Sequence, residues 1–466
     1  MRRKLCTLVL ALILVLTCAI GFVACDPTTD DPADEKPTHT DNPADEKPTH
    51  TDDPADEKPT HLDYFDFDGK TLMVWIGDSI AEGIVGPSPL SERENYAYYA
   101  MLGKGNDFTY VNKSVSGWKS GQLFTYLTDN AYKDDEAAFT TELLQRADII
   151  ELSILGNDLL QDNLGKLLVM TCQYLEEMEE KGESDKLDYV NDILFNDVYQ
   201  YAGYNDAEKA LGKVKGEPNP NNSTDNFAAI VERLYDLNPD VTLLVQTVYN
   251  PIFDTSTLVL EQPITYVDTD GTTKCWNDDT RTTREILLQD YGVTPAEYRE
   301  IGDFLIELMN DIVRDYAEDH PGTIEVVEIH DRFMEYHNAD TSEGQAYSRR
   351  LFSQDYIHPS NEGHAMIADV TQDKLVELGL AGANYLAEIK AIRCEQLDRM
   401  FSYAGSPVDV ASAKAAINNA TTAYEANLAY FNAITRPEYF DEVANRDGDR
   451  AYPIFTYVVP NYANNK

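Results

Sequence analysis

The chain has 466 residues, with 37 Lys and Arg against 82 Asp and Glu, and a formal net charge of −45. A surface this negative repels phosphate backbones, so it excludes non-specific nucleic-acid binding and disfavours docking on anionic lipid through protein charge. The length exceeds that of one ordinary domain, while 43% hydrophobic residues are ample for a packed core. Six cysteines are too few for a disulfide scaffold.

Residues 1–24 are typical of an export signal of the lipoprotein kind. Three basic residues at positions 2–4 precede an apolar run. Residues 22–25, Phe-Val-Ala-Cys, resemble the lipobox of bacterial lipoproteins, which is cut before the cysteine so that the thiol can be acylated. Phe22 departs from the usual Leu, and an uncleaved membrane anchor is the alternative. We expect an extracytoplasmic protein that contacts the cell membrane only through lipid on Cys25.

An acidic, proline-rich linker is expected over residues 25–63. The segment Pro-Ala-Asp-Glu-Lys-Pro-Thr-His recurs every 11 residues, starting at Pro32, Pro43 and Pro54. Proline and like charges keep such a segment extended and solvated. The histidine of each repeat could bind a metal weakly, but a duplicated spacer with incidental histidines is the favoured interpretation.

The body of the chain alternates between apolar runs and amphipathic helical patterns. The runs predict strands over residues 71–76, 108–115, 147–155, 241–248 and 324–329, and the patterns predict helices over 227–237, 297–318 and 361–378. Such alternation predicts a parallel sheet covered on both faces, with ligands bound at the carboxyl ends of its strands. A C-terminal extension over residues 381–466 is expected to be helical, as a hairpin over 386–400 and 411–434.

Four short polar segments fall at predicted strand ends or just before the last helix of the body. They are residues 77–83 (Gly-Asp-Ser-Ile-Ala-Glu-Gly), Ser116-Gly117, Gly156-Asn157-Asp158, and residues 355–359 (Asp-Tyr-Ile-His-Pro). Together they supply a hydroxyl, backbone and side-chain amide donors, and a carboxylate with an imidazole. These are the groups that acyl transfer through a covalent serine intermediate requires.

Each group has a physical role in that chemistry. The Ser79 hydroxyl needs a base within hydrogen-bond reach, and the neutral imidazole of His358 suits that task near pH 7. Asp355 precedes His358 by three residues, close enough to accept the Nδ1 proton. The backbone amides of Ser79 and Gly117 and the side-chain amide of Asn157 could donate to the oxygen that becomes negative.

In this order the four segments resemble the four blocks of the SGNH hydrolases, also called the GDSL esterase/lipase family, with the third block shortened. The resemblance spans residues 71 to about 378. It implies a flavodoxin-like three-layer α/β/α domain, over residues 64–380, with a five-stranded parallel sheet. It also implies a catalytic triad of Ser79, Asp355 and His358, and an oxyanion hole built from Ser79, Gly117 and Asn157. No cofactor and no metal are expected.

Two insertions, at about residues 159–223 and 252–296, separate the chain from a minimal member of this family. Both leave the carboxyl ends of strands, so we hypothesise that they form a cap that selects the substrate, with inert surface decoration as the alternative. The second insertion predicts a hairpin of residues 264–267 with 272–276. Asp268 and Asp270 in its turn could bind calcium together with Asp278 and Asp279, although a plain turn is favoured.

Several other residues have competing interpretations. His330, followed by Asp331 after the fifth strand, is a rival base, but such a pair more often only ends a strand. We expect His364 on a packing face, Asp78 to bond the backbone around the nucleophile turn, and Ser360 to cap the final helix of the body. The cysteines left after removal of the leader and lipidation are Cys172, Cys275 and Cys394, of which at least one stays free or bonds outside the chain.

The function expected from these residues is that of a surface-tethered serine esterase. Its substrate would be a small-molecule, carbohydrate or lipid ester, for example an acetylated carbohydrate. The alternatives are an acyltransferase of the same family, in which a sugar hydroxyl attacks the acyl-enzyme, and a non-catalytic solute-binding lipoprotein, which would have two similar lobes. The sequence leaves the oligomeric state open.

Overall fold

The computed structural model describes residues 69–85, 93–128, 135–160, 165, 168–169, 171–173, 176, 223–251, 260, 263–267, 272–294, 297–337, 350–353, 357–435, 442–443 and 452–453. The predicted leader, the lipidation site Cys25 and the linker over residues 25–63 lie outside these residues. So do Asp355 and most of the first insertion, and the cap therefore stays a hypothesis.

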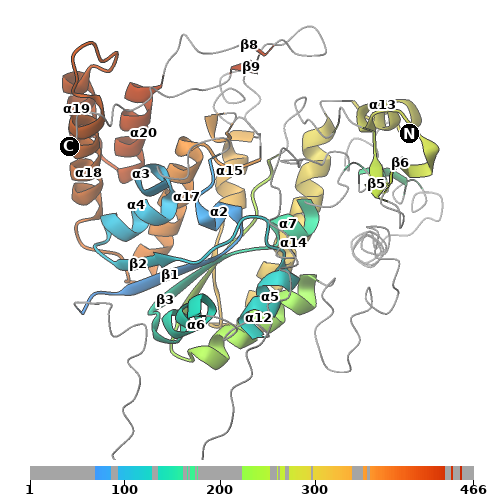
Figure 1. Ribbon diagram of the computed structural model, residues 1–466, viewed down its shortest axis with the longest axis horizontal. Helices are drawn as coiled ribbons and strands as arrows, with labels where there is room; N and C mark the ends of the chain where they lie inside the picture. Colours follow the sequence, from blue (N-terminus) through green and yellow to red (C-terminus); the bar gives the residue numbers. More distant parts are fainter. Residues whose placement is uncertain are drawn as a thin grey trace, which may run out of the picture. The chain divides into compact units, whose positions relative to one another are not determined.

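A five-stranded parallel sheet forms the centre of the described chain (Figure 1). Its strand order is β2-β1-β3-β4-β7, which is the flavodoxin-like order. The strands are β1 (Leu72–Gly77), β2 (Thr109–Asn112), β3 (Ile149–Ser153), β4 (Thr242–Gln246) and β7 (Glu325–Val327). Each of the five predicted strands is confirmed, and every residue of β1 and β3 is buried, as expected for strands covered on both faces.

Helices cover both faces of this sheet, which confirms the three-layer α/β/α fold (Figure 1). In one layer α12 packs against α5, α6 and α14, and in the other α17 packs against α3, α4 and α15. The first layer comprises α5 (Ser120–Thr128), α6 (Asp135–Arg146), α12 (Ser223–Leu237) and α14 (Tyr298–Asp319). The second comprises α3 (Arg93–Tyr96), α4 (Tyr98–Gly105), α15 (Ile329–His337) and α17 (Asn361–Glu377). Two short helices, α2 (Ser79–Glu82) and α7 (Gly156–Leu160), start at the carboxyl ends of β1 and β3.

The C-terminal extension is helical, but the predicted hairpin is wrong because its second helix is divided in two. The three helices are α18 (Tyr385–Phe401), α19 (Val410–Asn419) and α20 (Ala423–Ile434). The Thr422 hydroxyl accepts the backbone N–H of Glu425, and the Glu425 carboxylate accepts the backbone N–H of Thr422. This capping box starts a new helix where the apolar pattern alone runs on. Further along, β8 (Glu442–Val443) and β9 (Tyr452–Pro453) form a short antiparallel pair.

These C-terminal helices share one hydrophobic core with the sheet. Buried residues of α18 and α20, such as Leu397 and Phe431, belong to the same cluster as Trp75 of β1. At the junction, the buried guanidinium of Arg393 donates to the side chain of Asn427 at 2.7 Å. The apolar face of the extension is therefore covered by the α/β body and not by solvent.

The second insertion contains the predicted hairpin, formed by β5 (Thr265–Val267) and β6 (Thr273–Cys275). It also contains a helix that the sequence analysis missed, α13 (Thr283–Asp290), which a capping box of Thr282 and Glu285 begins. The turn of the hairpin, with Asp268 and Asp270, lies outside the described residues. Of the two calcium candidates that follow the hairpin, Asp278 and Asp279, Asp279 binds the guanidinium of Arg281 through both carboxylate oxygens.

The described residues bear on two further questions, whether the cysteines are paired and whether a helix could cross a membrane. Cys275 and Cys394 form no disulfide bonds, and Cys172 is buried. Among the helices of the described ranges, none combines the length and the apolar character that crossing a bilayer requires.

Candidate active site

The nucleophile turn depends on a close approach between β1 and β3. The backbone N–H of Asp78 donates to the carbonyl of Ser153 at 2.9 Å, which pulls the end of β1 onto its neighbour. Gly77 has a φ of +137°, and a Cβ at this position would lie 1.9 Å from the Ser153 carbonyl oxygen. Only glycine fits there, and the turn delivers Ser79 to the start of α2 at the carboxyl edge of the sheet.

Asp78 stabilises this turn, as the sequence analysis predicted. Its carboxylate caps α2 by accepting the backbone N–H of Ile80 at 2.9 Å, and the Ser153 hydroxyl lies 3.4 Å away. The side chain is only 2% exposed. Burial raises the pKa of Asp78 to about 7, although the hydrogen bond from the Ile80 N–H acts in the opposite direction.

The structure brings Ser79 and His358 together across 279 positions of sequence, with 2.9 Å between Ser79 Oγ and His358 Nε2. This distance is a hydrogen bond between a hydroxyl and an imidazole, the contact through which a base activates a nucleophile. Ser79 comes from the end of β1, and His358 comes from the loop that precedes α17. Asp355 lies outside the described residues, so its place in a triad stays a prediction.

The loop that carries His358 is anchored on both sides of the histidine. The His358 carbonyl accepts the backbone N–H of Ser353 at 2.9 Å, and the Ile357 carbonyl accepts the Tyr249 hydroxyl at 2.8 Å. The Tyr249 ring stacks on Phe333, with 4.7 Å between ring centroids. These contacts fix the backbone that presents the imidazole. Tyr249 is a supporting residue that the sequence analysis missed.

Ser360 caps α17, as predicted. Its hydroxyl oxygen accepts the backbone N–H groups of Glu362 at 3.2 Å and Gly363 at 3.1 Å. The cap satisfies two of the amides that a helix start leaves unpaired, and it fixes the loop two residues after His358.

The loop after β2 lies beside the nucleophile helix. The backbone N–H of Val115 donates to the Gly77 carbonyl at 2.9 Å, and Asn157 donates its side-chain amide to the Trp118 carbonyl at 3.0 Å. Gly117, between these anchors, has a φ of +82°, a conformation that favours glycine. The structure thus gathers the loop of Gly117 and the side chain of Asn157 around α2. Whether they donate to a substrate oxygen stays a prediction.

Two acidic residues of the motifs hold neighbouring segments and were not assigned a role from sequence. Asp158 accepts the backbone N–H of Ser120 at 2.9 Å, at the start of α5. Glu82, the last residue of α2, accepts the backbone N–H of Ser116 at 2.6 Å and pairs with Arg93. Both contacts join segments that are distant in sequence.

A layer of buried polar side chains lies below the site. Tyr98 donates its hydroxyl to the Glu151 carboxylate at 2.7 Å, and Glu151 is fully buried in β3. Burial raises the pKa of Glu151 to about 8. His364 is also fully buried, stacked on Tyr98 with its Nε2 atom 3.1 Å from the Ile84 carbonyl. Burial lowers the pKa of His364 to about 3, so the predicted packing position of this histidine is confirmed.

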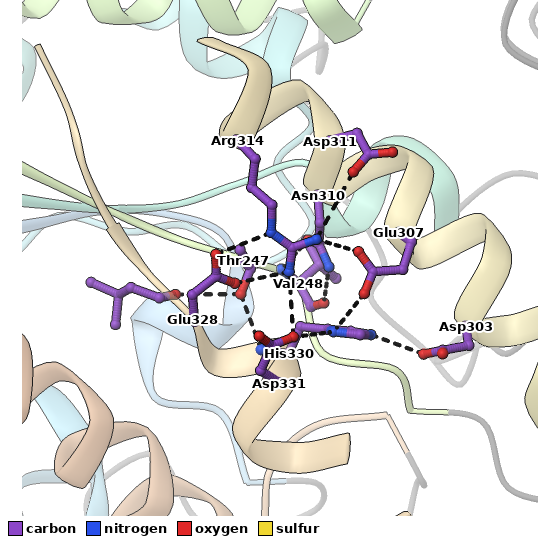
Figure 2. Close-up of polar contacts among 11 residues, drawn as sticks. Thr247, Val248, Asp303, Glu307, Asn310, Asp311, Arg314, Glu328, His330 and Asp331 are labelled. Atoms are coloured by element: carbon purple, nitrogen blue, oxygen red, sulfur yellow. Dashed lines mark hydrogen bonds and ion pairs between the residues drawn. The ribbon is translucent and has the colours of Figure 1, made fainter. Parts of the chain in front are cut away.

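His330 belongs to a separate ionic cluster formed by α14 and by the segment that runs from Glu328, just after β7, into α15 (Figure 2). Its Nε2 atom lies 2.9 Å from an Asp303 oxygen, and its Nδ1 atom lies 2.9 Å from a Glu307 oxygen. Burial alone would lower the pKa of His330, but these two hydrogen bonds raise it to about 10. An imidazole that already holds its proton at neutral pH cannot accept another, so the rival-base interpretation of His330 is wrong.

The same cluster has the ligand types of a cation site, since atoms of Asp303, Glu307 and His330 lie within 4.8 Å of one another. Arg314 also reaches the Glu307 carboxylate and binds Glu328 at 2.9 Å (Figure 2). A protonated imidazole and a guanidinium therefore already pair with these carboxylates. The arrangement is an ion-pair network that joins α14 to the segment after β7.

Comparisons with known proteins give likenesses of fold only. No family model matches the chain, and no curated protein matches it. The solved structures to which the chain is similar include a phospholipase A1 from Streptomyces albidoflavus, at 15% identity and a TM-score of 0.37, covering 66% of this chain and 99% of that one. A lipase from a goat rumen metagenome has 13% identity and a TM-score of 0.33, covering 65% of this chain and 97% of the lipase.

A member of the lipolytic G-D-S-L family from Veillonella parvula is similar at 13% identity, with a TM-score of 0.30, covering 66% of this chain and 97% of that one. At such values a likeness assigns no activity, which has to come from the side chains of the site itself. These three structures are described as a lipase, a phospholipase A1 and a member of the lipolytic G-D-S-L family, and each is matched over about two thirds of this chain.

Proposed function

We propose that the chain is a serine ester hydrolase of the SGNH type, in which Ser79 is the nucleophile and His358 its general base. The observation that carries this proposal is the 2.9 Å between Ser79 Oγ and His358 Nε2. Support also comes from the place of the pair, at the carboxyl edge of a parallel sheet, where α/β folds bind their ligands.

The chemistry follows from these atoms. His358 Nε2 takes the proton of the Ser79 hydroxyl while Oγ bonds to the ester carbonyl carbon, and the carbonyl oxygen becomes negative. The backbone amides of Ser79 and Gly117 and the side-chain amide of Asn157 are proposed to donate to that oxygen. The carbon–oxygen bond to the alcohol then breaks, and His358 returns its proton to the leaving alcohol.

Water completes the cycle. His358 takes a proton from the water as its oxygen attacks the acyl-enzyme, the bond to Oγ breaks, and the proton returns to Ser79 as the acid is released. Asp355 is proposed to hold the Nδ1 proton of His358 and so to fix the tautomer in which Nε2 accepts.

The proposed substrate is a small-molecule, carbohydrate or lipid ester outside the cytoplasm, with removal of acetyl groups from a carbohydrate as one case. The lipobox-like segment over residues 22–25 supports export and acylation at Cys25. The net charge of −45 argues against a polyanionic substrate. Metabolic labelling with palmitate tests the anchor: label on the wild type and none on Cys25→Ala is expected.

The proposal is tested with p-nitrophenyl esters of increasing chain length and with a fluorophosphonate, which phosphonylates active serines with loss of fluoride. We expect hydrolysis and labelling by the wild type, neither by Ser79→Ala, and both by Ser412→Ala, a matched control whose hydroxyl bonds Asp409 on α19. Equal hydrolysis by the wild type and Ser79→Ala would remove the proposal. The chain-length profile distinguishes a short-chain esterase from a lipase.

Two alternatives are separated by further observations. Adding a sugar acceptor to the same assay reveals an acyltransferase, because acyl groups would then appear on the sugar in place of free acid. The solute receptor would need two similar lobes. The described residues hold one five-stranded parallel sheet and two two-stranded pairs, which does not support that architecture.

A further inference from the structure

We propose that Glu82, neutralised by Arg93, is a positioning residue for the oxyanion loop, defined as residues 115–118. The inference rests on the proposed function, because it concerns how the donor Gly117 is placed relative to Ser79. Glu82 is the last residue of α2, and Ser79 is the first. One side chain thus joins the helix of the nucleophile to the loop of the donor.

Both bonds from Glu82 to the loop go to the residue immediately before Gly117. Glu82 Oε2 accepts the backbone N–H of Ser116 at 2.6 Å and also accepts the Ser116 hydroxyl. Ser116 is exposed. A hydrogen bond to a carboxylate is about twice as strong as one between neutral groups, which suits an anchor at a solvated position.

Backbone bonds hold the two ends of the loop, and the Trp118 N–H closes it as a turn by donating to the Val115 carbonyl at 3.2 Å. Val115 is tied to the Gly77 carbonyl before Ser116, and Trp118 is tied to Asn157 after Gly117. Glu82 holds the residue between these two anchors. The peptide that joins Ser116 to Gly117 carries the N–H proposed to meet the substrate oxygen, so its orientation follows that of Ser116.

Arg93 supplies the positive charge that pairs with the Glu82 carboxylate. Its Nη1 atom donates to Glu82 Oε1 at 2.5 Å and to the Glu82 backbone carbonyl at 3.3 Å. The two side chains are 14% and 23% exposed, so their attraction is screened less than that of a surface pair. An uncompensated carboxylate beside a developing oxyanion would raise the energy of the transition state, and the guanidinium cancels that charge.

The C-terminal extension holds the helix from which Arg93 reaches. Arg393 of α18 donates to the Asn95 backbone carbonyl in α3, and Gln396 donates to the Asn95 side chain at 3.3 Å. Contacts therefore run without a break from α18 through α3 and Arg93 to Glu82 and the oxyanion loop. The extension thus supports the site through these contacts, although none of the residues proposed for the site lies in the extension.

The test compares kcat and KM for a p-nitrophenyl ester among variants of the pair. Glu82→Ala is expected to lower kcat about 10- to 100-fold, less than full loss of an oxyanion donor, with KM within about 2-fold. Glu82→Gln keeps an acceptor for Ser116 and is expected to recover most of that loss. Arg93→Gln leaves the Glu82 carboxylate uncompensated and should lower kcat about 10-fold. The double variant Glu82→Gln/Arg93→Gln has no such charge, so its kcat should be higher than that of Arg93→Gln alone.

The control is Glu328→Gln, which removes a part-buried ion pair with Arg314 beside β7, the last strand of the sheet. It should lower the Tm and leave kcat unchanged. A Glu82→Ala variant with wild-type kcat and a lower Tm would show that the pair is only structural. If Glu82→Ala does not fold, the inference is overturned when the kcat of the double variant Glu82→Gln/Arg93→Gln is no higher than that of Arg93→Gln. Ser79→Ala as active as the wild type would instead remove the proposed function.

Discussion

Two histidines stand at the carboxyl edge of the same sheet in opposite chemical situations. His358 faces the neutral hydroxyl of Ser79, whereas both ring nitrogens of His330 face carboxylates. His330 therefore carries a proton at neutral pH, with a pKa of about 10, and serves as a cation. The difference teaches that a histidine after a strand becomes a base or a structural ion according to the groups that other elements bring to it.

The two histidines are also held in different ways. The loop of His358 is held through backbone carbonyls, by Ser353 and Tyr249, and the His358 ring contacts the Ser79 hydroxyl. His330 is fixed through its ring, by ion pairs with Asp303 and Glu307. Substitutions at the two positions should therefore affect different measurements, activity in one case and stability in the other.

The largest effect is expected from His358→Ala. Loss of the proposed base should lower kcat for a p-nitrophenyl ester about 10³- to 10⁵-fold, which is the size of loss known for members of catalytic triads. His330→Gln, measured in the same assay, should stay within about 5-fold of the wild type. A loss of activity in His330→Gln as large as in His358→Ala would break the comparison.

The second effect is on stability. His330→Gln leaves Asp303 and Glu307 without their imidazolium, and we expect the free energy of unfolding at pH 7 to fall by about 2 kcal/mol, less than for a fully buried pair. Urea unfolding followed by fluorescence gives the value. His320→Gln, at an exposed histidine, is the control and should change stability by less than about 0.5 kcal/mol. Equal effects of the two variants would contradict the ion-pair role.

The third effect is a pH dependence of that stability. The folded pKa of His330, about 10, lies above its ordinary value of 6.5. Its contribution is thus complete below about pH 6.5 and is lost as the pH rises towards 10. The difference in unfolding free energy between the wild type and His330→Gln should shrink over this window. A difference that stays constant from pH 6 to pH 10 would exclude a charged His330.

The smallest expected effect concerns stability and compares two carboxyl groups, Glu307 and Glu151. Burial alone would raise the pKa of Glu307, but His330 and Arg314 lower it. Glu151 accepts a hydrogen bond from a neutral group, the Tyr98 hydroxyl, and burial raises its pKa to about 8. Folding therefore favours protonated Glu151, and the native state loses stability as the pH rises from about 4.5 to 8. Glu151→Gln still accepts from Tyr98 and should be about 1 kcal/mol more stable than the wild type at pH 8.

Thermal unfolding of the wild type and Glu151→Gln at pH 5 and pH 8 measures this effect. The variant should lose less stability than the wild type between the two values, and Asp78, with its pKa of about 7, should account for part of the slope that remains. A variant that is less stable than the wild type at pH 8 would show that the carboxylate has a partner worth more than its burial costs.

The sheet, and the positions of Ser79 and His358 at its carboxyl edge, could be predicted from sequence because apolar runs and short polar motifs mark them. Apolar runs mark the buried strands, and the close approach of β1 to β3 requires the glycine that begins the Gly-Asp-Ser segment. The helices α13 and α20 were missed or misplaced although Thr282 with Glu285 and Thr422 with Glu425 show the spacing of capping boxes.

The pairing of side chains could not be predicted in the same way. Glu82 meets Arg93 and Ser116 only because separate elements converge at the sheet edge. Asp303 and Glu307 share a face of α14 by their four-residue spacing, but nothing in that spacing says that His330 lies opposite. Such contacts depend on tertiary packing, which a one-dimensional pattern does not contain.

The core that α18–α20 share with the sheet decides where the chain can be shortened. A protein that stops at Leu380 would expose the apolar sides of α4 and α17 that α18 and α20 now cover. Exposed patches of that kind promote aggregation, so such a protein should be insoluble when produced in bacteria. Ending the chain after Thr435 keeps all three helices and is the shorter form to choose for crystallisation or directed evolution.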